Sequence, residues 1–146
     1  MTVLLDAFAL IALLADEPAA EQVETLIRRG TTAITPINLA EALDVLQRVG
    51  KIPQERLQAL TTPLIGQEIA LAQIDERIAR EAADIRARRY HRTRAALSLA
   101  DCILLAATGA SDTLASADEI LIRTAKAEGI GVEVLSRRSS GSSREP

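Results

Sequence analysis

The chain has 146 residues, of which 48% are hydrophobic and 25% are charged, and its 20 acidic and 17 basic side chains give a net charge of −3. This composition is typical of one soluble globular domain with a single core. The single cysteine excludes an intramolecular disulfide, and the single histidine excludes both a histidine-rich zinc centre and a pair of catalytic imidazoles. The net negative charge argues against a protein that holds nucleic acid through bulk charge alone, which leaves room for a local basic patch.

The first half of the chain is predicted to alternate between short strands and helices. Residues 2–5 form an apolar run without alternation, which is typical of a strand buried on both faces of a parallel sheet. Asp16 and Pro18 have the spacing of an N-cap and a first helical turn, and Gly30 marks the end of that helix. The predicted strands here are 2–5 and 32–34, and the predicted helices are 7–15, 18–29, 36–49 and 53–60.

The second half continues this alternation after Pro63 and Gly66 interrupt the chain. Asp75 is the predicted N-cap of a long helix, which ends at a polar loop over residues 90–94. The predicted strands are 68–71, 113–116 and 131–135, and the predicted helices are 75–89, 98–109 and 118–128. Strands and helices that alternate in this way predict an α/β fold, a three-layer α/β/α sandwich with a mostly parallel central sheet.

The folded domain is expected to span residues 1–136. Residues 137–146 are rich in Ser, Gly and Arg, and we expect a flexible tail because they offer too little apolar surface to order themselves. The N-terminus carries no basic segment, and the apolar run over residues 7–15 is shorter than the roughly 20 residues that cross a bilayer. We therefore expect a cytoplasmic protein without membrane contact.

Three aspartates lie where a carboxylate is unexpected. Asp6 stands between two apolar runs, Asp101 is the only charge on an otherwise apolar helix, and Asp118 directly follows the predicted strand 113–116. An ionised carboxylate among apolar neighbours is unfavourable unless cations or several hydrogen-bond donors surround it.

Each of these aspartates also has a purely structural interpretation. Asp6 has the position of a helix N-cap, and Asp101 has the spacing of a capping box with Ser98. Asp118 is an acid at a helix N-terminus, with Ser116 and Glu119 at capping-box spacing beside it. The structural and the functional interpretation remain open for all of them.

Glu41 is less informative alone. It lies on the predicted helix 36–49, and Asn38, Asp44 and Arg48 share its side of that helix, so a solvated stripe with an Asp44–Arg48 ion pair is the simplest interpretation. Glu41 has Val45 at i+4 and therefore no helical cation partner. This leaves Glu41 free for another role without requiring one.

Together the acids indicate a metal site. Carboxylates that follow parallel strands can converge at the carboxyl edge of the sheet, where open α/β folds bind ligands, and their mutual repulsion favours a divalent cation among them. Oxygen ligands without His or Cys suit Mg²⁺ or Mn²⁺. Since the chain has neither a Gly-rich phosphate loop nor a P-loop lysine, the pattern indicates phosphodiester hydrolysis by a metal-activated water.

Several segments resemble the motifs of the PIN domain family, and more closely those of VapC-like toxins from toxin-antitoxin pairs. The segment Leu97 to Thr108 is the most specific of them, and the resemblance covers about residues 1–136. The other matching segments are Val3 to Asp6 with Ala9 to Leu14, Thr35 to Glu41, and Leu114 to Glu119.

The resemblance implies a PIN-like fold and a Mg²⁺- or Mn²⁺-dependent endoribonuclease. It implies a homodimer formed through apolar helix faces, such as helix 7–15, and an antitoxin protein that covers the acidic cleft. The implied catalytic residues and metal ligands are Asp6, Glu41, Asp101 and Asp118, with Ser116 as a polar helper. One departure is that Ala7 and Phe8 follow the first aspartate, where the family commonly has Ser or Thr.

The densest positive charge lies over residues 86–94, where Tyr90 and His91 stand among arginines. Arginines with an aromatic side chain between them suit the phosphates and stacked bases of single-stranded RNA. An ordinary solvated helix end is the alternative, because cations there also favour the helix dipole. The predicted RNA-binding residues are Arg86, Arg88, Arg89, Arg92 and Arg94.

Two other functions fit parts of the pattern. A phospho-acceptor receiver domain also gathers acids at a sheet edge, but it needs a lysine near the last strand, and Lys126 lies inside a predicted helix. A catalytically silent PIN-like module that only binds RNA or a protein is the main alternative, given Ala7 and Phe8. Metal-dependent cleavage of RNA by the purified protein separates this module from a nuclease.

Overall fold

The centre of the fold is a five-stranded sheet with the strand order β3-β2-β1-β4-β5, seen in a computed structural model that describes residues 1–138. All neighbouring strands pair in parallel, which confirms the predicted α/β class. The strands are β1 (Thr2–Leu5), β2 (Thr31–Ile34), β3 (Ile69–Leu71), β4 (Thr113–Ser116) and β5 (Gly131–Val134).

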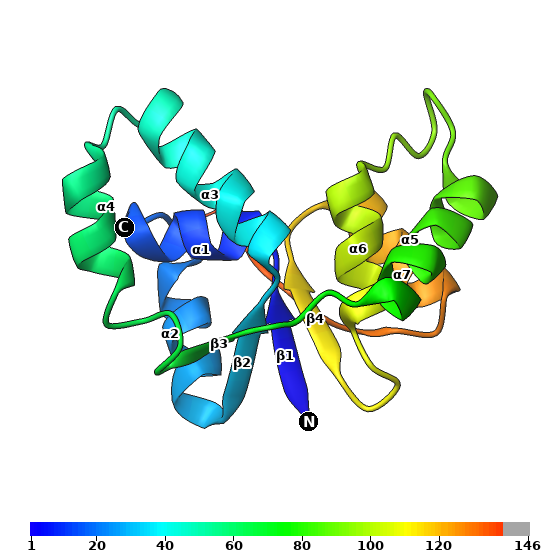
Figure 1. Cartoon of the computed structure of the whole chain (residues 1–146), viewed down its shortest axis with the longest axis horizontal. Helices are drawn as coiled ribbons and strands as arrows, with labels where there is room; N and C mark the ends of the chain where they lie inside the picture. The colour runs from blue at the N-terminus through cyan, green and yellow to red at the C-terminus, as the bar shows by residue number, and fades with distance from the viewer. Residues whose placement is uncertain (139–146) are drawn as a thin grey trace, which may run out of the picture.

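Helices cover both faces of the sheet, so the predicted three layers are present (Figure 1). In that view α1, α3 and α4 lie on the left, α2 overlaps β2 and β3, and α5 to α7 lie on the right. The helices are α1 (Ala7–Leu14), α2 (Ala20–Arg29), α3 (Pro36–Arg48), α4 (Gln54–Thr61), α5 (Glu76–Arg89), α6 (Leu99–Ala107) and α7 (Glu119–Ala127).

Two apolar clusters hold these layers together. Successive side chains of a strand point to opposite faces, so Leu4 of β1 joins one cluster and Leu5 joins the other. Leu4 packs in the cluster of α5, α6 and α7, and Leu5 packs in the cluster of α1, α2 and α3. Because both faces of β1 are buried, its sequence is a continuous apolar run rather than an alternating one.

The strand order reverses direction at β1, in the middle of the sheet. β1 lies between β2 and β4, with Leu5 beside Ile34 on one side and Ala115 on the other. The chain adds β2 and β3 on one side of β1 and then returns to add β4 and β5 on the opposite side. A reversal of this kind leaves a crevice outside the carboxyl ends of the strands, where α/β folds bind ligands.

One predicted helix start is wrong. α2 begins at Ala20 rather than at Pro18, and its N-cap, Ala19, makes no side-chain cap hydrogen bond. Asp16 has a φ of 50°, in the left-handed region, so it turns the chain between α1 and α2 instead of capping a helix. The N-cap predicted at Asp75 is confirmed, since its side chain accepts a backbone N–H of α5, and Thr35 caps α3 in the same way.

The predicted tail, residues 137–146, lies outside the described residues except for Arg137 and Arg138. Among the described residues, no helix combines the length and the apolar character that a bilayer crossing requires.

Candidate active site

The acids predicted to form the site lie around the carboxyl ends of β1 and β4. Asp6 directly follows β1, and its backbone N–H donates to the Ala115 carbonyl of β4 over 3.3 Å. Asp118 follows β4 and is the N-cap of α7. Glu41 lies on α3, and Asp101 lies in the first turn of α6. The sheet, α3 and α6 therefore each contribute to the candidate site.

Asp6 is the most strongly perturbed of these acids. Its side chain is almost fully buried, with an exposed fraction of 6%. Its pKa is raised to about 6, chiefly by burial and also by the charges of Asp101 and Asp118, while the hydrogen bonds of the Ser116 hydroxyl and the Ala9 N–H oppose the shift. A carboxylate held at such a position without a cation is unfavourable, as the sequence indicated.

Asp101 interacts electrostatically with each of the other acids. Its charge raises the pKa of Asp6 and the pKa of Glu41, in both cases after the larger effect of burial. The pKa of Asp101 itself is raised, first by burial and then by the charge of Asp118, while hydrogen bonds with Ser98 oppose the shift. Asp101 is thus the point at which the acids from three different parts of the chain come together.

Glu41 and Asp118 are both exposed, and Asp118 is more exposed than Asp6 and Asp101. The predicted Asp44–Arg48 ion pair is present, with 3.0 Å between Arg48 Nη2 and Asp44 Oδ2. The solvated stripe on α3 is only partly correct, because Asn38 is 1% exposed. The Thr35 hydroxyl donates to Asn38 Oδ1 over 2.6 Å, and this buried polar pair beside the site was not identified from the sequence.

The three aspartates also cap helices, so their structural interpretations hold as well. Asp6 Oδ1 accepts from Ala9 N over 2.9 Å, and Asp118 Oδ1 accepts from Leu121 N over 2.9 Å. Asp101 and Ser98 form the predicted capping box of α6. The predicted capping box of Ser116 and Glu119 is not formed, because Asp118 is the cap and its N–H donates to Ser116 Oγ instead. A cap of this kind uses one carboxylate oxygen, so capping and ligation do not compete for the same atom.

A ready-made ligand shell is absent from residues 1–138: no three or more His, Cys, Asp or Glu side chains there are arranged so that they could hold a metal ion. The donor set nevertheless fits a hard divalent cation by its chemistry, because it consists of carboxylates, and the charges of Asp101 and Asp118 raise the pKa values of neighbouring acids. Such mutual repulsion is what a bound cation would relieve.

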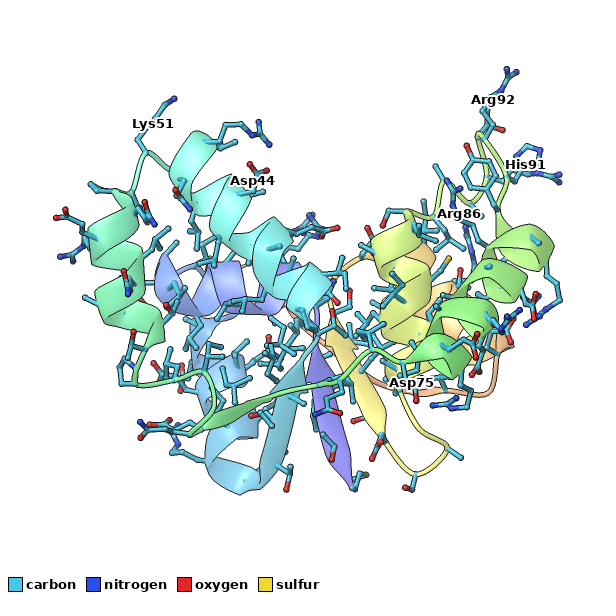
Figure 2. The ribbon with its side chains drawn as sticks, viewed as in Figure 1. Asp44, Lys51, Asp75, Arg86, His91 and Arg92 are labelled. Carbon is cyan, nitrogen blue, oxygen red and sulfur yellow. The ribbon has the colours of Figure 1, made fainter. Side chains whose placement is uncertain are left out.

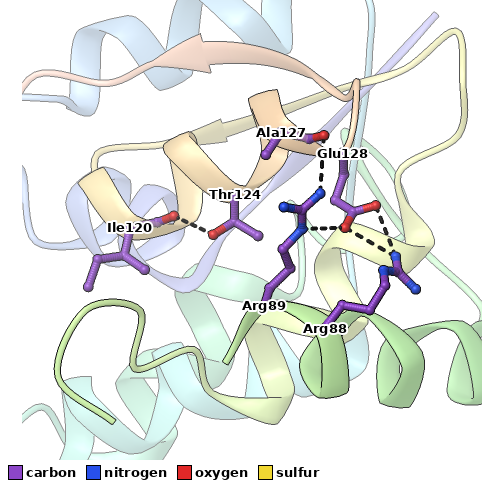
Figure 3. Close-up of polar contacts among 6 residues, drawn as sticks. All are labelled: Arg88, Arg89, Ile120, Thr124, Ala127 and Glu128. Carbon is purple, nitrogen blue, oxygen red and sulfur yellow. Dashed lines mark hydrogen bonds and ion pairs between the residues drawn. The ribbon is translucent and has the colours of Figure 1, made fainter. Parts of the chain in front are cut away.

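The predicted basic segment separates into arginines with different surroundings. The Arg86 side chain donates through Nε to the Leu97 carbonyl over 3.1 Å, and its guanidinium lies 4.6 Å from the Tyr90 ring centroid. Arg88 and Arg89 both contact Glu128 at the end of α7, at 3.1 Å and 2.8 Å (Figure 3). These three arginines therefore have structural contacts outside α5, which neither the RNA-binding interpretation nor that of a solvated helix end included.

Arg92 and Arg94 lie on the loop that follows α5. Arg92 points away from the body of the molecule, at the tip of the loop (Figure 2). The Arg94 carbonyl accepts a hydrogen bond from Arg123 of α7 over 2.9 Å. Arg123 was not identified from the sequence, because it lies 29 residues further along the chain and no local pattern connects the two.

A model of the PIN domain matches residues 3–127 of the chain. The chain belongs to the PIN domain family. This family membership confirms the resemblance inferred from the segments around the four acids.

Among solved structures, this PIN domain is similar to a chain of the crystal structure of VapBC2 from Rickettsia felis bound to a DNA fragment from their promoter. The TM-score is 0.66 at 17% sequence identity, and the match covers 93% of this chain and 100% of that chain. At this identity the similarity shows a shared fold. A comparison with curated proteins finds no match.

The PIN domain departs from the family pattern at Ala7 and Phe8, and the structure shows what stands there. Ala7 is the first residue of α1, immediately after the cap Asp6. The Phe8 ring lies beneath the guanidinium of Arg137, which is 5.2 Å from the ring centroid and also donates to the Ala117 carbonyl over 3.3 Å. Among the described residues the hydroxyl that affects Asp6 is that of Ser116 on β4.

Proposed function

We propose that this PIN domain is a Mg²⁺- or Mn²⁺-dependent endoribonuclease, the toxin of a toxin-antitoxin pair. The observation that carries the proposal is the position of Asp101, whose charge couples to Asp6, Glu41 and Asp118 at the crevice beside β1 and β4. Membership of the PIN family and the fold shared with a VapBC2 chain support it.

Asp6, Glu41, Asp101 and Asp118 would hold the cation. A bound Mg²⁺ or Mn²⁺ supplies a water activated at neutral pH and positive charge opposite the phosphodiester group. Asp6 has to be ionised to act as a ligand, and its raised pKa of about 6 means that a neutral or alkaline pH favours this form. The Ser116 hydroxyl, next to Asp6, would orient the reacting groups as a polar helper.

The substrate in this proposal is RNA, and the arginine-rich segment contributes to its affinity. Arg86, Arg88, Arg89, Arg92 and Arg94 would approach the phosphates, with Arg92 and Arg94 as the freest of them. Arginine binds phosphate through a planar fork of N–H donors, which suits this role. The chemistry itself remains with the acids.

The proposed assembly is a cytoplasmic homodimer, kept inactive by an antitoxin protein that covers the acidic cleft. Part of the apolar surface of α1 is left open, since Leu13 and Leu14 line a hollow of about 440 Å³ together with Ile27 and Leu64. Open apolar surface of this kind is typical of protein interfaces. Light scattering of the purified chain at micromolar concentration should give the mass of a dimer, and a monodisperse monomer would exclude the dimer.

A catalytically silent PIN module that binds RNA or a protein is the second candidate. It is favoured by the absence of a ready ligand shell among the described residues and by Ala7 and Phe8 after Asp6. The two candidates differ in one measurable property, which is metal-dependent cleavage.

The deciding experiment follows cleavage of a labelled single-stranded RNA with Mn²⁺, with Mg²⁺ and with EDTA. Wild-type protein should cleave only with metal, and Asp101→Asn should lose at least 100-fold in rate while its circular dichroism spectrum stays unchanged. Asp75→Asn is the control, because the Asp75 carboxylate also accepts a backbone N–H at the start of a helix, as the N-cap of α5, without shifting the pKa of any of the four acids. Full activity of Asp101→Asn at saturating metal would exclude the proposed ligand role.

A further inference from the structure

Arg137 makes two contacts that join separate parts of the candidate active site. Its guanidinium lies 5.2 Å from the centroid of the Phe8 ring, and its Nε donates to the Ala117 carbonyl over 3.3 Å. Phe8 is the second residue of α1, two positions after Asp6, and Ala117 directly precedes Asp118. One side chain therefore connects the chain just after β1 with the chain just after β4, and each of these segments carries an acid of the site.

The segment that carries Arg137 is held in place by contacts of its own. The Leu135 N–H donates to the Ser116 carbonyl of β4 over 2.8 Å, and the Leu135 side chain is buried in the cluster of α1, α2 and α3. The Ser136 N–H donates to Gln22 Oε1 of α2 over 2.7 Å. The backbone before Arg137 is therefore fixed, so its side chain loses less conformational entropy in making the two contacts than one on a free segment would.

The charge of Arg137 is not used in an ion pair with a described acid. The ion pairs among residues 1–138 do not include Arg137, and the charges that act on Asp6 and Asp101 are those of other acids. A guanidinium that served to neutralise these acids would be expected to pair with one of them. Arg137 contacts a ring face and a backbone carbonyl instead, and both contacts depend on direction. This arrangement favours holding two segments together over neutralising the acids.

We propose that Arg137 is a positioning residue, which holds Asp118 at a fixed place relative to Asp6. The inference rests on the proposed function in taking a divalent cation as the ligand of these acids. Phe8 belongs to the pair of residues at which the chain departs from the family pattern, and its ring offers the guanidinium a face that Ser or Thr would not. Residues that orient metal ligands from outside the ligand set strongly affect metal affinity, so the role should be measurable as binding.

Calorimetric titration with Mn²⁺ at neutral pH tests the direction of the effect. If charge alone mattered, the loss of a positive charge near acids would strengthen the binding of a cation. Arg137→Gln should instead weaken Mn²⁺ binding about tenfold, with an unchanged circular dichroism spectrum, because Asp118 is no longer held. Arg138→Gln is the matched control, because it removes the same charge from the next residue, whose described hydrogen bonds involve only its backbone. It should not weaken Mn²⁺ binding.

Two variants of Phe8 test whether Arg137 acts through the ring. Phe8→Leu should weaken Mn²⁺ binding in the wild-type chain and have no further effect in the Arg137→Gln variant. Phe8→Tyr keeps the ring face and should bind Mn²⁺ as the wild type does. Effects of Phe8→Leu and Arg137→Gln that multiply in the double variant would overturn the connection through the ring, as would an equal loss in Phe8→Tyr and Phe8→Leu.

Amide hydrogen exchange in EDTA keeps this inference separate from the proposed function. The Asp118 N–H donates to Ser116 Oγ over 3.0 Å, and the Leu121 N–H donates to Asp118 Oδ1 over 2.9 Å. Both N–H groups should exchange faster in Arg137→Gln than in the wild type and in Arg138→Gln, because the segment around Asp118 opens more readily.

Faster exchange in Arg137→Gln supports the positioning role even if the wild type fails to bind Mn²⁺, a result that would exclude the proposed metal site alone. Unchanged exchange in Arg137→Gln would overturn the positioning role whether or not the wild type binds Mn²⁺. Binding of Mn²⁺ by Arg137→Gln that is as tight as in the wild type, or tighter, would overturn it as well.

Discussion

Ser98 and Asp101 hydrogen bond to each other in both directions at the start of α6. The Asp101 N–H donates to Ser98 Oγ over 3.0 Å, and the Ser98 N–H donates to Asp101 Oδ2 over 3.2 Å. The same carboxylate raises the pKa values of Asp6 and Glu41, which belong to other elements. The capping box therefore holds in place the carboxylate of Asp101, which acts on the other acids of the candidate site. One side chain thus both caps α6 and belongs to the site.

Substitutions at Ser98 and Asp101 should separate these roles. Ser98→Ala removes the acceptor for the Asp101 N–H and should lower the free energy of unfolding by about 1 kcal/mol. Asp101→Asn retains a side-chain oxygen for the Ser98 N–H and should change that free energy by less. Urea denaturation in EDTA measures both values. A larger loss for Asp101→Asn than for Ser98→Ala would indicate that Asp101 serves the fold more than the site.

Asp6→Asn should stabilise the metal-free protein in a pH-dependent way. The folded-state pKa of Asp6 is raised from 3.8 to about 6, so the native state keeps this proton while the unfolded state loses it. Stability therefore falls as pH rises from about 4 to about 6, by about 3 kcal/mol for this group, and stays level above that. Asp6→Asn removes the effect, so the variant should exceed the wild type at pH 8 and match it at pH 4. Thermal unfolding in EDTA at both pH values is the measurement. The same stability difference between Asp6→Asn and the wild type at pH 4 and pH 8 would contradict this prediction.

Glu41 and Asp44 offer a matched pair on one helix. Both are exposed residues of α3, but Glu41 is affected by Asp101, whereas Asp44 pairs with Arg48 and has its pKa lowered by that pair. Glu41→Gln should weaken Mn²⁺ binding at least tenfold in calorimetric titration, because it removes a carboxylate from the donor set. Asp44→Asn should leave Mn²⁺ binding unchanged. Equal weakening in the two variants would show a general charge effect rather than ligation.

Glu128 should contribute to stability through the junction of α5 and α7. Its side chain is 16% exposed and contacts two arginines, and the Arg89 hydrogen bond is the largest of the effects that lower its pKa. Glu128→Gln should lower the free energy of unfolding by about 1 kcal/mol at pH 7. A carboxyl group whose folded pKa is lowered stabilises the protein above its usual pKa, and this contribution is lost as pH falls through the folded pKa. The difference between wild type and variant should therefore shrink as the pH falls below the ordinary glutamate pKa of 4.5.

The more exposed Glu81–Arg77 pair provides the control for Glu128. Its members are 49% and 68% exposed and belong to one helix. Glu81→Gln should change stability less than Glu128→Gln, because solvent screens an exposed pair. A difference at Glu128 that does not shrink as the pH falls would indicate a packing defect instead of a lost ion pair.

Local sequence determined the strands and helices of this fold and most of the residues at which they begin and end. The run 2–5, the N-cap Asp75, and the Ser98–Asp101 spacing each predict a structure that depends only on neighbouring residues, and each is confirmed. The start of α2 is the exception. There Asp16 adopts a left-handed conformation and caps nothing, which its local sequence did not reveal.

The tertiary structure alone decided which side chains meet. The sequence places one acid after β1 and another after β4. Asp6 and Asp118 come close because these two strands, which are far apart in the chain, pair side by side in the sheet. The same holds for the basic segment, where contacts with Arg123 of α7 and with Glu128, the C-cap of α7, distinguish arginines that look equivalent in sequence. Caps and helix ends depend on contacts a few residues apart, whereas charge coupling depends on distances in space, and those are set by how strands and helices pack.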